Sequence, residues 1–258
     1  MGNLYGGGDG GRHAHANCGI WLLASYMNHS CAGNSKRSFV GDMQILRATT
    51  DIPAGTELLF AYKPPQRLES YADVQKVLNA GWNFTCDCQL CRDKQATSKD
   101  ALKKRAALVQ QAGTILRGPR PINTSKVLAI VQKMEETYPE TNGSHVRLEL
   151  TDPYFAVATQ LLLGKPTEAV KVIVKGLEAL GFSITADTAA AKGLTPQLEV
   201  ERWGLATRMV PSAFIMLFKA YKTLAPELCS RAKKYAEVAY SIEVGHKDGM
   251  AEMLPVPI

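Results

Sequence analysis

The chain has 258 residues, a hydrophobic fraction of 46% and a formal net charge of +6, which is typical of a protein that buries a core in one or two domains. No apolar run approaches the ~20 residues that span a bilayer, and the N-terminus lacks the apolar stretch of a secretory signal. We therefore predict an intracellular protein, in the nucleus or the cytoplasm, that does not insert into a membrane. In a reducing compartment, clustered cysteines more often bind metal than form disulfides.

The N-terminal quarter of the chain consists of short elements separated by turn signals. Residues 1–18 are rich in glycine, which predicts a flexible lead-in. The stretch RSFVGDMQILRAT alternates like two strands around Gly41-Asp42, and Gly55 marks a turn before the apolar run ELLFAY. In the hairpin we expect four residues to point inward: Val40, Met43, Ile45 and Leu46.

From about residue 99 onward the pattern becomes helical. Apolar residues recur at helical spacing between residues 102 and 116, 170 and 180, and 214 and 224. The stretch GKPTEAVKVIVKGLEALGF predicts a capped helix, with Pro166 at its beginning and Gly181 just after its end. Another helix is expected to begin at Pro226. Helices joined by short turns favour a solenoid or bundle of the tetratricopeptide kind, although no strict 34-residue period is found.

A basic segment opens this helical part. Between Lys94 and Met134 there are nine Lys or Arg and a single acid, Asp100, a local balance of +8. Such a face could meet nucleic acid or an acidic protein. A solvated helix surface with a basic linker is the plainer interpretation, and we favour it over a nucleic-acid interface.

Three of the six cysteines stand in the stretch WNFTCDCQLC, at Cys86, Cys88 and Cys91. A structural zinc site takes four ligands in a tetrahedron, and thiolates at this spacing supply three from one loop. The fourth ligand must come from elsewhere in the chain, and the candidates are Cys18, Cys31, Cys229 and the five histidines.

The stretches NHSCAGN, AGTELLFAY and WNFTCDCQLC together resemble the C-terminal half of a SET domain and its post-SET loop. SET domains are the catalytic modules of most protein-lysine methyltransferases, and the spacing is similar to that of the SET-and-MYND subfamily and of fungal proteins with SET and tetratricopeptide parts. The resemblance implies an α+β chain with a small β-rich SET segment, a zinc-binding post-SET loop and an all-α, tetratricopeptide-like domain. Its expected bounds are 19–65 for the SET part, 66–93 for the post-SET part and 99–258 for the helical domain.

The resemblance also implies roles for single residues. Cys31 would be the fourth zinc ligand beside the three later cysteines. Asn28 and His29 would contact the cofactor S-adenosylmethionine, Phe84 would cover it, and Tyr62 would be the catalytic tyrosine. A phenol at the end of a narrow channel can orient the attacking lysine amine without competing as a nucleophile. Phe60 would line the substrate channel, where its missing hydroxyl should favour higher methylation.

The sequence departs from the family pattern at several places. Gly33 replaces the usual proline, which should loosen the turn, and Ala61 replaces an aspartate. The Gly-x-Gly strand that contacts the cofactor and the MYND zinc finger are not found, so we expect the chain to be the C-terminal portion of a longer enzyme.

Two functions follow from these expectations. The first is an S-adenosylmethionine-dependent protein-lysine N-methyltransferase acting on histones or other proteins, with a possible protein partner for the helical domain. The second is a non-catalytic scaffold, in which zinc stabilises a SET remnant beside helical repeats. Cofactor binding discriminates the two, because a scaffold has no need of S-adenosylmethionine.

Overall fold

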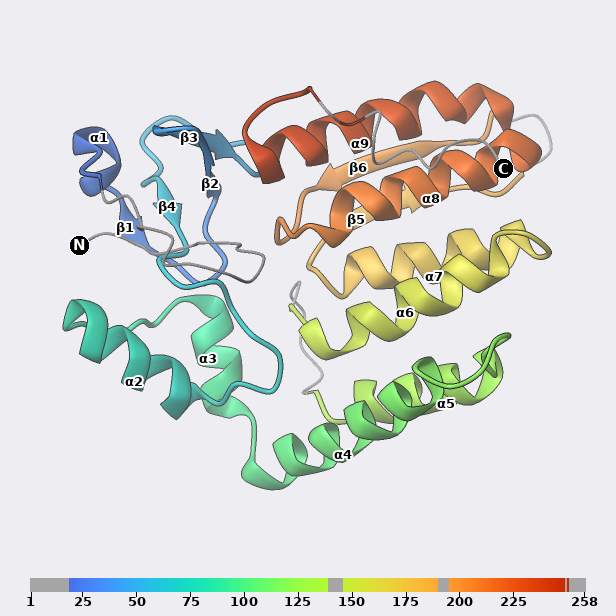
Figure 1. Cartoon of the computed structure of the whole chain (residues 1–258), viewed down its shortest axis with the longest axis horizontal. Helices are drawn as coiled ribbons and strands as arrows, with labels where there is room; N and C mark the ends of the chain where they lie inside the picture. Colours follow the sequence, from blue (N-terminus) through green and yellow to red (C-terminus); the bar gives the residue numbers. More distant parts are fainter. Residues whose placement is uncertain (1–18, 139–145, 190–194, 249, 251–258) are drawn as a thin grey trace, which may run out of the picture.

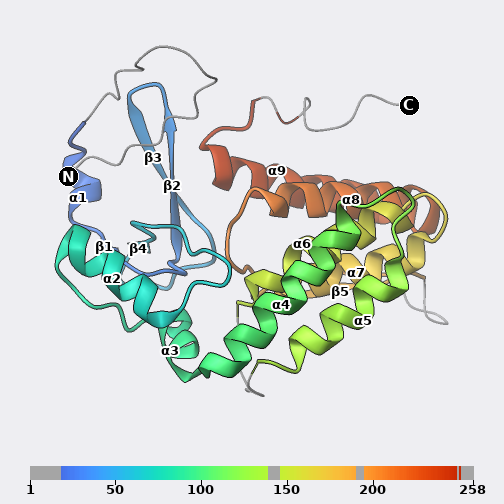
Figure 2. The same cartoon turned by 60° about the horizontal axis from the view of Figure 1, so that its bottom comes forward.

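The computed structural model describes residues 19–138, 146–189, 195–248 and 250. The predicted lead-in and Cys18 lie outside these residues. The β-strands of the N-terminal part and helices α1–α3 gather at one end of the molecule, and a stack of longer helices forms the other (Figures 1 and 2). The α+β class is confirmed. No helix of the described ranges is long and apolar enough to cross a membrane.

The N-terminal part is built from two small sheets. Strands β2 (Ser35–Val40) and β3 (Met43–Ala48) pair antiparallel around the predicted turn, where Gly41 has a φ of 59°. Strand β1 (Asn28–His29) pairs in parallel with β4 (Leu59–Phe60). Gly55 has a φ of 83°, which confirms the turn before β4.

One expectation for the hairpin is wrong. Met43 is 60% exposed because it stands beside the turn at the tip of the hairpin. The other three residues that we expected to point inward are half-buried. The apolar run before β1 forms the single-turn helix α1 (Leu22–Ser25), whose leucines are exposed.

Two helices carry the chain past the SET segment. Helix α2 (Tyr71–Trp82) begins with a capping box between Ser70 and Asp73 and ends at Asn83, which adopts the left-handed conformation. Helix α3 (Gln89–Ala96) follows at once and has Cys88 as its N-cap residue. Leu78 of α2 is fully buried against the cysteines, so this part has a small core of its own.

The remaining helices pack in series. They are α4 (Lys99–Leu116), α5 (Thr124–Glu135), α6 (Leu148–Leu161), α7 (Pro166–Glu178), α8 (Met209–Leu224), a short 3₁₀ turn (Pro226–Leu228) and α9 (Cys229–Val244). Each helix contacts the next one along the chain, and one hydrophobic core runs through all of them. The predicted entries at Pro166 and Pro226 are confirmed, and Gly181 has a φ of 88°. The tetratricopeptide label stays a prediction.

The expectation that residues 99–258 contain helices alone is wrong at one place. Strands β5 (Ser183–Ala186) and β6 (Leu198–Arg202) form an antiparallel pair between α7 and α8. Ile184 and Leu198 face the helical core, and alternating residues of β6 face solvent. Strands this short give a weaker periodic signal than the helices that flank them.

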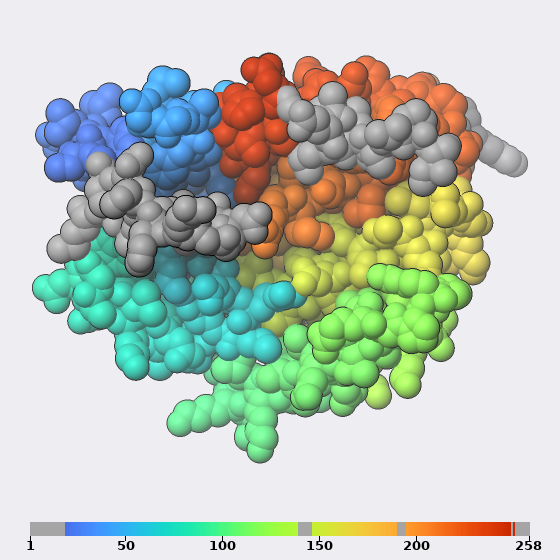
Figure 3. All heavy atoms as spheres, viewed as in Figure 1, coloured from blue at the N-terminus to red at the C-terminus, as the bar shows by residue number. Residues whose placement is uncertain are grey.

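The helical stack holds the SET segment in place. Lys36 of β2 forms an ion pair of 2.7 Å with Glu243 of α9, and Arg47 of β3 donates to the carbonyl of Gly245 at 3.0 Å. On the other side, the amide of Leu68 donates to Glu149 of α6 at 2.7 Å. The hairpin and the red C-terminal helix accordingly form a continuous surface at the top of Figure 3.

Candidate active site and metal centre

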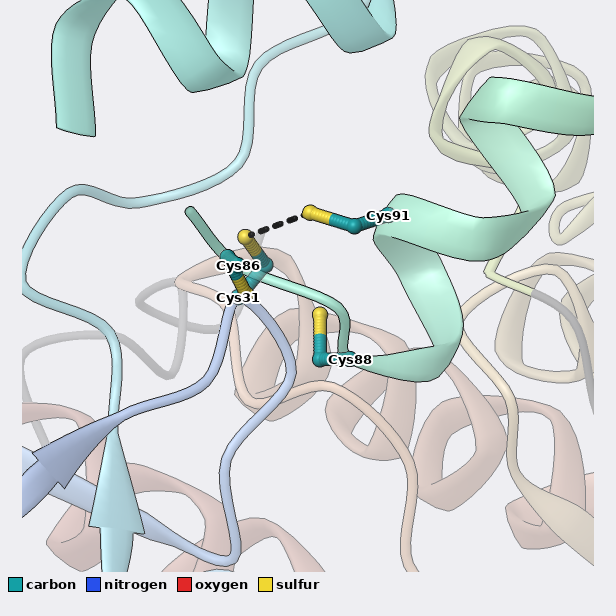
Figure 4. A group of neighbouring side chains, drawn as sticks. All are labelled: Cys31, Cys86, Cys88 and Cys91. Atoms are coloured by element: carbon teal, nitrogen blue, oxygen red, sulfur yellow. Dashed lines mark hydrogen bonds between the residues drawn. The ribbon is translucent and has the colours of Figure 1, made fainter. Parts of the chain in front are cut away.

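Four cysteines from two distant segments meet at one place. Cys31 follows β1, Cys86 and Cys88 lie in the loop before α3, and Cys91 lies in the first turn of α3 (Figure 4). All four sulfur atoms lie within 4.8 Å of one another, and the Sγ atoms of Cys31 and Cys91 are 3.6 Å apart. Of the fourth ligands that the sequence left open, the structure brings Cys31 to the triple, while Cys229 lies against Phe218 in the helical stack.

This geometry fits a tetrahedral zinc ion. Zinc–sulfur bonds of roughly 2.3 Å give sulfur–sulfur edges of roughly 3.8 Å, close to the separations observed. Three of the four cysteines are buried and the fourth is half-buried, as in closed structural sites. The donor set therefore suits zinc held for structure rather than zinc with an open catalytic position.

The thiols are strongly coupled electrostatically. Hydrogen bonds from Cys31 and Cys91 hold the pKa of the Cys88 thiol far below its ordinary value, and hydrogen bonds to Cys88 and Cys91 raise the pKa of Cys31. A single thiolate among protonated thiols explains this division, since four thiolates at such distances repel one another. A divalent cation among the sulfurs removes that repulsion and releases the remaining protons.

Gln75 of α2 supports the cysteines and was not predicted from the sequence. Its amide oxygen accepts from the backbone N–H of Cys86 at 2.8 Å, and its amide nitrogen donates to the carbonyl of Cys86 at 3.0 Å. The same nitrogen lies 3.5 Å from the sulfur of Cys91. This side chain thus fixes one ligand by its backbone and contacts a second by its sulfur.

Aromatic rings enclose Tyr62, which follows β4. Its ring centroid lies 5.3 Å from those of His29 and Phe60, 5.5 Å from that of Trp82 and 6.1 Å from that of Phe84. The structure therefore brings four of the predicted site residues into one cluster: His29, Phe60, Tyr62 and Phe84. Trp82, at the end of α2, is a member that sequence reasoning missed.

The Tyr62 hydroxyl is held in a fixed direction. It donates a hydrogen bond of 2.7 Å to the backbone carbonyl of Met27, which fixes where the phenol oxygen lies at the end of the ring. Burial raises the pKa of this phenol, an effect that the nearby charge of Arg37 opposes. Tyr62 accordingly remains a neutral phenol throughout the physiological range.

Asn28 and His29 occupy neighbouring positions on β1 but face different surroundings. The side chain of Asn28 is exposed and donates to Glu57 at 2.7 Å. His29 is half-buried, and its two ring nitrogens contact the backbone N–H of Tyr62 and the sulfur of Cys31. Burial lowers the pKa of His29, which keeps the imidazole neutral.

A cavity of about 250 Å³ opens beside Tyr62. Phe60, Tyr62 and Trp82 line one wall, and Arg37, Phe39 and residues of the α1 region line the others. The guanidinium of Arg37 lies over the ring of Phe60, 5.1 Å from its centroid. Sequence reasoning missed Arg37 because its contact with this site depends on the pairing of β2 with its neighbours.

Comparison with known proteins identifies the N-terminal segment. Residues 8–63 match the SET domain family, a span that overlaps the predicted SET part, 19–65, and ends two residues before it. A Gibberella zeae protein named methyltransferase is 49% identical over 237 residues, which cover 92% of this chain and 32% of that protein. The mouse protein-lysine N-methyltransferase SMYD4 is 25% identical over 170 residues, 66% of this chain and 20% of its own length.

A third relative matches a shorter stretch. The histone-lysine N-methyltransferase SET5 of Meyerozyma guilliermondii is 36% identical over 80 residues, which cover 29% of this chain and 16% of that protein. The chain thus spans about a third of the Gibberella protein's length and a fifth of the mouse protein's.

Proposed function

Since the chain belongs to the SET-domain protein-lysine methyltransferase family, we propose that it forms the lysine-facing part of an S-adenosylmethionine-dependent protein-lysine N-methyltransferase. The observation that carries the proposal is the setting of Tyr62. An oriented, neutral phenol stands in an aromatic cage at a cavity, beside four cysteines that fit zinc. The substrate class that we propose is a lysine side chain of a histone or another protein.

The residues around Tyr62 have separate tasks in this proposal. Bound S-adenosylmethionine would supply the electrophilic methyl group. The Tyr62 oxygen would accept a hydrogen bond from the lysine amine, so that the nitrogen lone pair is directed away from the phenol. Phe60 and Trp82 would exclude water and surround the apolar stem of the lysine, because their rings line the cavity.

Zinc would act at a distance from this chemistry. The ion would be bound by Cys31, Cys86, Cys88 and Cys91, and would join the loop after β1 to α3. It would thereby hold the ring of Phe84 beside that of His29, whose centroids lie 5.6 Å apart. In this proposal Asn28, Phe84 and the backbone of His29 face the cofactor.

The size of the cavity favours a second candidate. A volume of about 250 Å³ is below the ~300–1,000 Å³ of pockets that enclose most of a drug-sized ligand. This cavity alone therefore encloses the reacting groups but not a whole cofactor. This observation is compatible with a zinc-stabilised scaffold for protein interaction, with the helical stack as the binding surface.

Calorimetric titration of the zinc-loaded chain with S-adenosylmethionine separates the two candidates. The enzyme proposal expects micromolar binding that Asn28→Ala weakens about tenfold, the loss of one good polar contact. It further expects Tyr62→Phe to retain binding but to lose transfer of radioactive methyl to histones. Tyr26→Phe is the matched control, because Tyr26 is 84% exposed. No detectable heat at a confirmed zinc content of one per chain would favour the scaffold.

A further inference from the structure

One side chain spans the distance between the cysteine cluster and the aromatic cage. Nδ1 of His29 lies 3.0 Å from the backbone nitrogen of Tyr62, and Nε2 lies 3.3 Å from Sγ of Cys31. The two contacts are made by the two nitrogens of one imidazole, on opposite sides of the ring.

The protonation of this ring follows from its partners. A backbone N–H can only donate, so Nδ1 of His29 must carry a lone pair and no proton. The neutral ring then has its proton on Nε2, where it points at the sulfur of Cys31.

The neighbourhood of His29 restricts its movement. His29 pairs with Phe60 across the two-residue parallel strands, so the backbone on both sides of the ring is fixed. The rings of Tyr62 and Phe84 pack against the imidazole, with centroids 5.3 and 5.6 Å away. Rotation of the ring therefore breaks both hydrogen bonds and disturbs the cage.

We propose that His29 is a positioning residue that transmits the state of the four-cysteine cluster to the backbone of Tyr62. A cation bound at Cys31 fixes the position of that sulfur, and the contact of the sulfur with Nε2 then orients the ring so that Nδ1 accepts from the amide of Tyr62. The link goes beyond a stabilising role for zinc, since it makes the placement of Tyr62 depend on the position of the Cys31 sulfur. It rests on the proposed function only for its catalytic consequence.

Two substitutions separate the halves of the link. The side-chain amide of asparagine takes the position of Nδ1, so His29→Asn keeps an acceptor for Tyr62 and loses the contact with Cys31. The amide of the longer glutamine takes the position of Nε2, so His29→Gln keeps the contact with Cys31 and loses the acceptor for the backbone N–H of Tyr62. His246→Asn is the control, because His246 packs on Tyr240 at the end of the helical stack.

The readout is the amide resonance of Tyr62 in a chain labelled with ¹⁵N-tyrosine and assigned through Tyr62→Phe. Exchange of Zn²⁺ for the larger Cd²⁺ should shift this resonance by more than its linewidth in the wild type and in His246→Asn. The shift should disappear in both His29 variants, because each breaks one half of the link. Metal affinity should fall about tenfold or more in His29→Asn and less in His29→Gln.

Three results would overturn the inference. They are a Tyr62 resonance indifferent to metal exchange in the wild type, an undiminished response in either His29 variant, and the reverse order of metal affinities. The proposed function is tested separately by methyl transfer. A Tyr62 amide that responds to the metal in a chain without transferase activity would leave the link standing and remove the proposed function.

Discussion

Gly33 lies so close to the backbone of Leu59 that no side chain fits between them. A Cβ at Gly33 would stand 2.3 Å from the carbonyl oxygen of Leu59 and 2.9 Å from Cα of Phe60. The side chain of Asn34 closes the same contact, since it donates to the carbonyl of Glu57 and accepts from the amide of Leu59. The segment after Cys31 is thereby pressed against the strand that leads to Tyr62. The expectation that glycine loosens this turn is wrong.

Gly33→Ala should destabilise the chain by about 1–3 kcal/mol, because the backbone of β4 must move to admit the methyl group. For a chain of this size that corresponds to a loss of roughly 2–10 °C in Tm. Gly164→Ala is the control, since a Cβ at Gly164 meets nothing within 4 Å. Equal melting temperatures for the two variants in scanning calorimetry would contradict this prediction, because they would show that the backbone of β4 moves without a loss of stability.

Gln75→Ala should weaken zinc binding about tenfold to a hundredfold, as expected when a group that orients a ligand is removed. The variant frees the backbone of Cys86 and removes a contact with the sulfur of Cys91. Competition with a chromophoric chelator measures the affinity. Gln111→Ala, on an exposed position of α4, should leave it unchanged. An unchanged affinity in Gln75→Ala would mean that the four sulfurs are arranged without help from α2.

The cysteine cluster could be predicted from the sequence because most of its geometry is local. Cys86, Cys88 and Cys91 must lie near one another whatever the fold, and the motif around Cys31 supplied the distant partner. Trp82 and Gln75 carry no comparable signal. They reach the site only because α2 packs beside β4 and the loop before α3, which is a tertiary relationship. No motif in the sequence distinguishes this tryptophan and this glutamine from helix residues that have no role in a site.

The basic segment illustrates the same limit. Its charge predicts a solvated face, and Lys103 and Lys104 of α4 are indeed exposed. Arg105, next in the chain, is only 5% exposed. It donates to the hydroxyl and the carbonyl of Thr137 at 2.9 and 3.0 Å, and its guanidinium lies 3.6 Å from the ring centroid of Tyr138. Composition assigns a charge to a segment, but packing decides which member of the segment is structural.

Arg105→Lys should therefore destabilise the chain by about 1–3 kcal/mol even though it keeps the charge. A lysine ammonium cannot reproduce the planar fork that bonds Thr137 twice while it stacks on Tyr138. Lys104→Ala, one position earlier, should change the free energy of unfolding by less than about 0.5 kcal/mol. Urea denaturation of both variants provides the comparison. A stable Arg105→Lys chain would mean that the stacking and the second hydrogen bond contribute little.

Glu178, at the end of α7, offers a prediction about pH. Burial raises the pKa of its carboxyl group, and the positive charges of Arg147 and Lys175 only partly oppose that effect. A raised folded-state pKa means that the folded chain favours the neutral carboxyl. The resulting stability is fully present below the unfolded pKa and is lost as the pH rises through the folded pKa.

Glu178→Gln should consequently raise the Tm at pH 7, where the native carboxylate is charged and partly desolvated, and should leave it nearly unchanged at pH 4. The glutamine resembles the protonated acid in shape and hydrogen bonding, so the gain should appear only above the folded pKa. Glu199→Gln, at an exposed position of β6, removes the same charge without the burial and should show no such pH-dependent gain. Calorimetric scans of the three chains at several pH values between 4 and 7 make the test. A stabilisation by Glu178→Gln that is as large at pH 4 as at pH 7 would contradict the prediction, because it would have to arise from packing rather than from the cost of the buried charge.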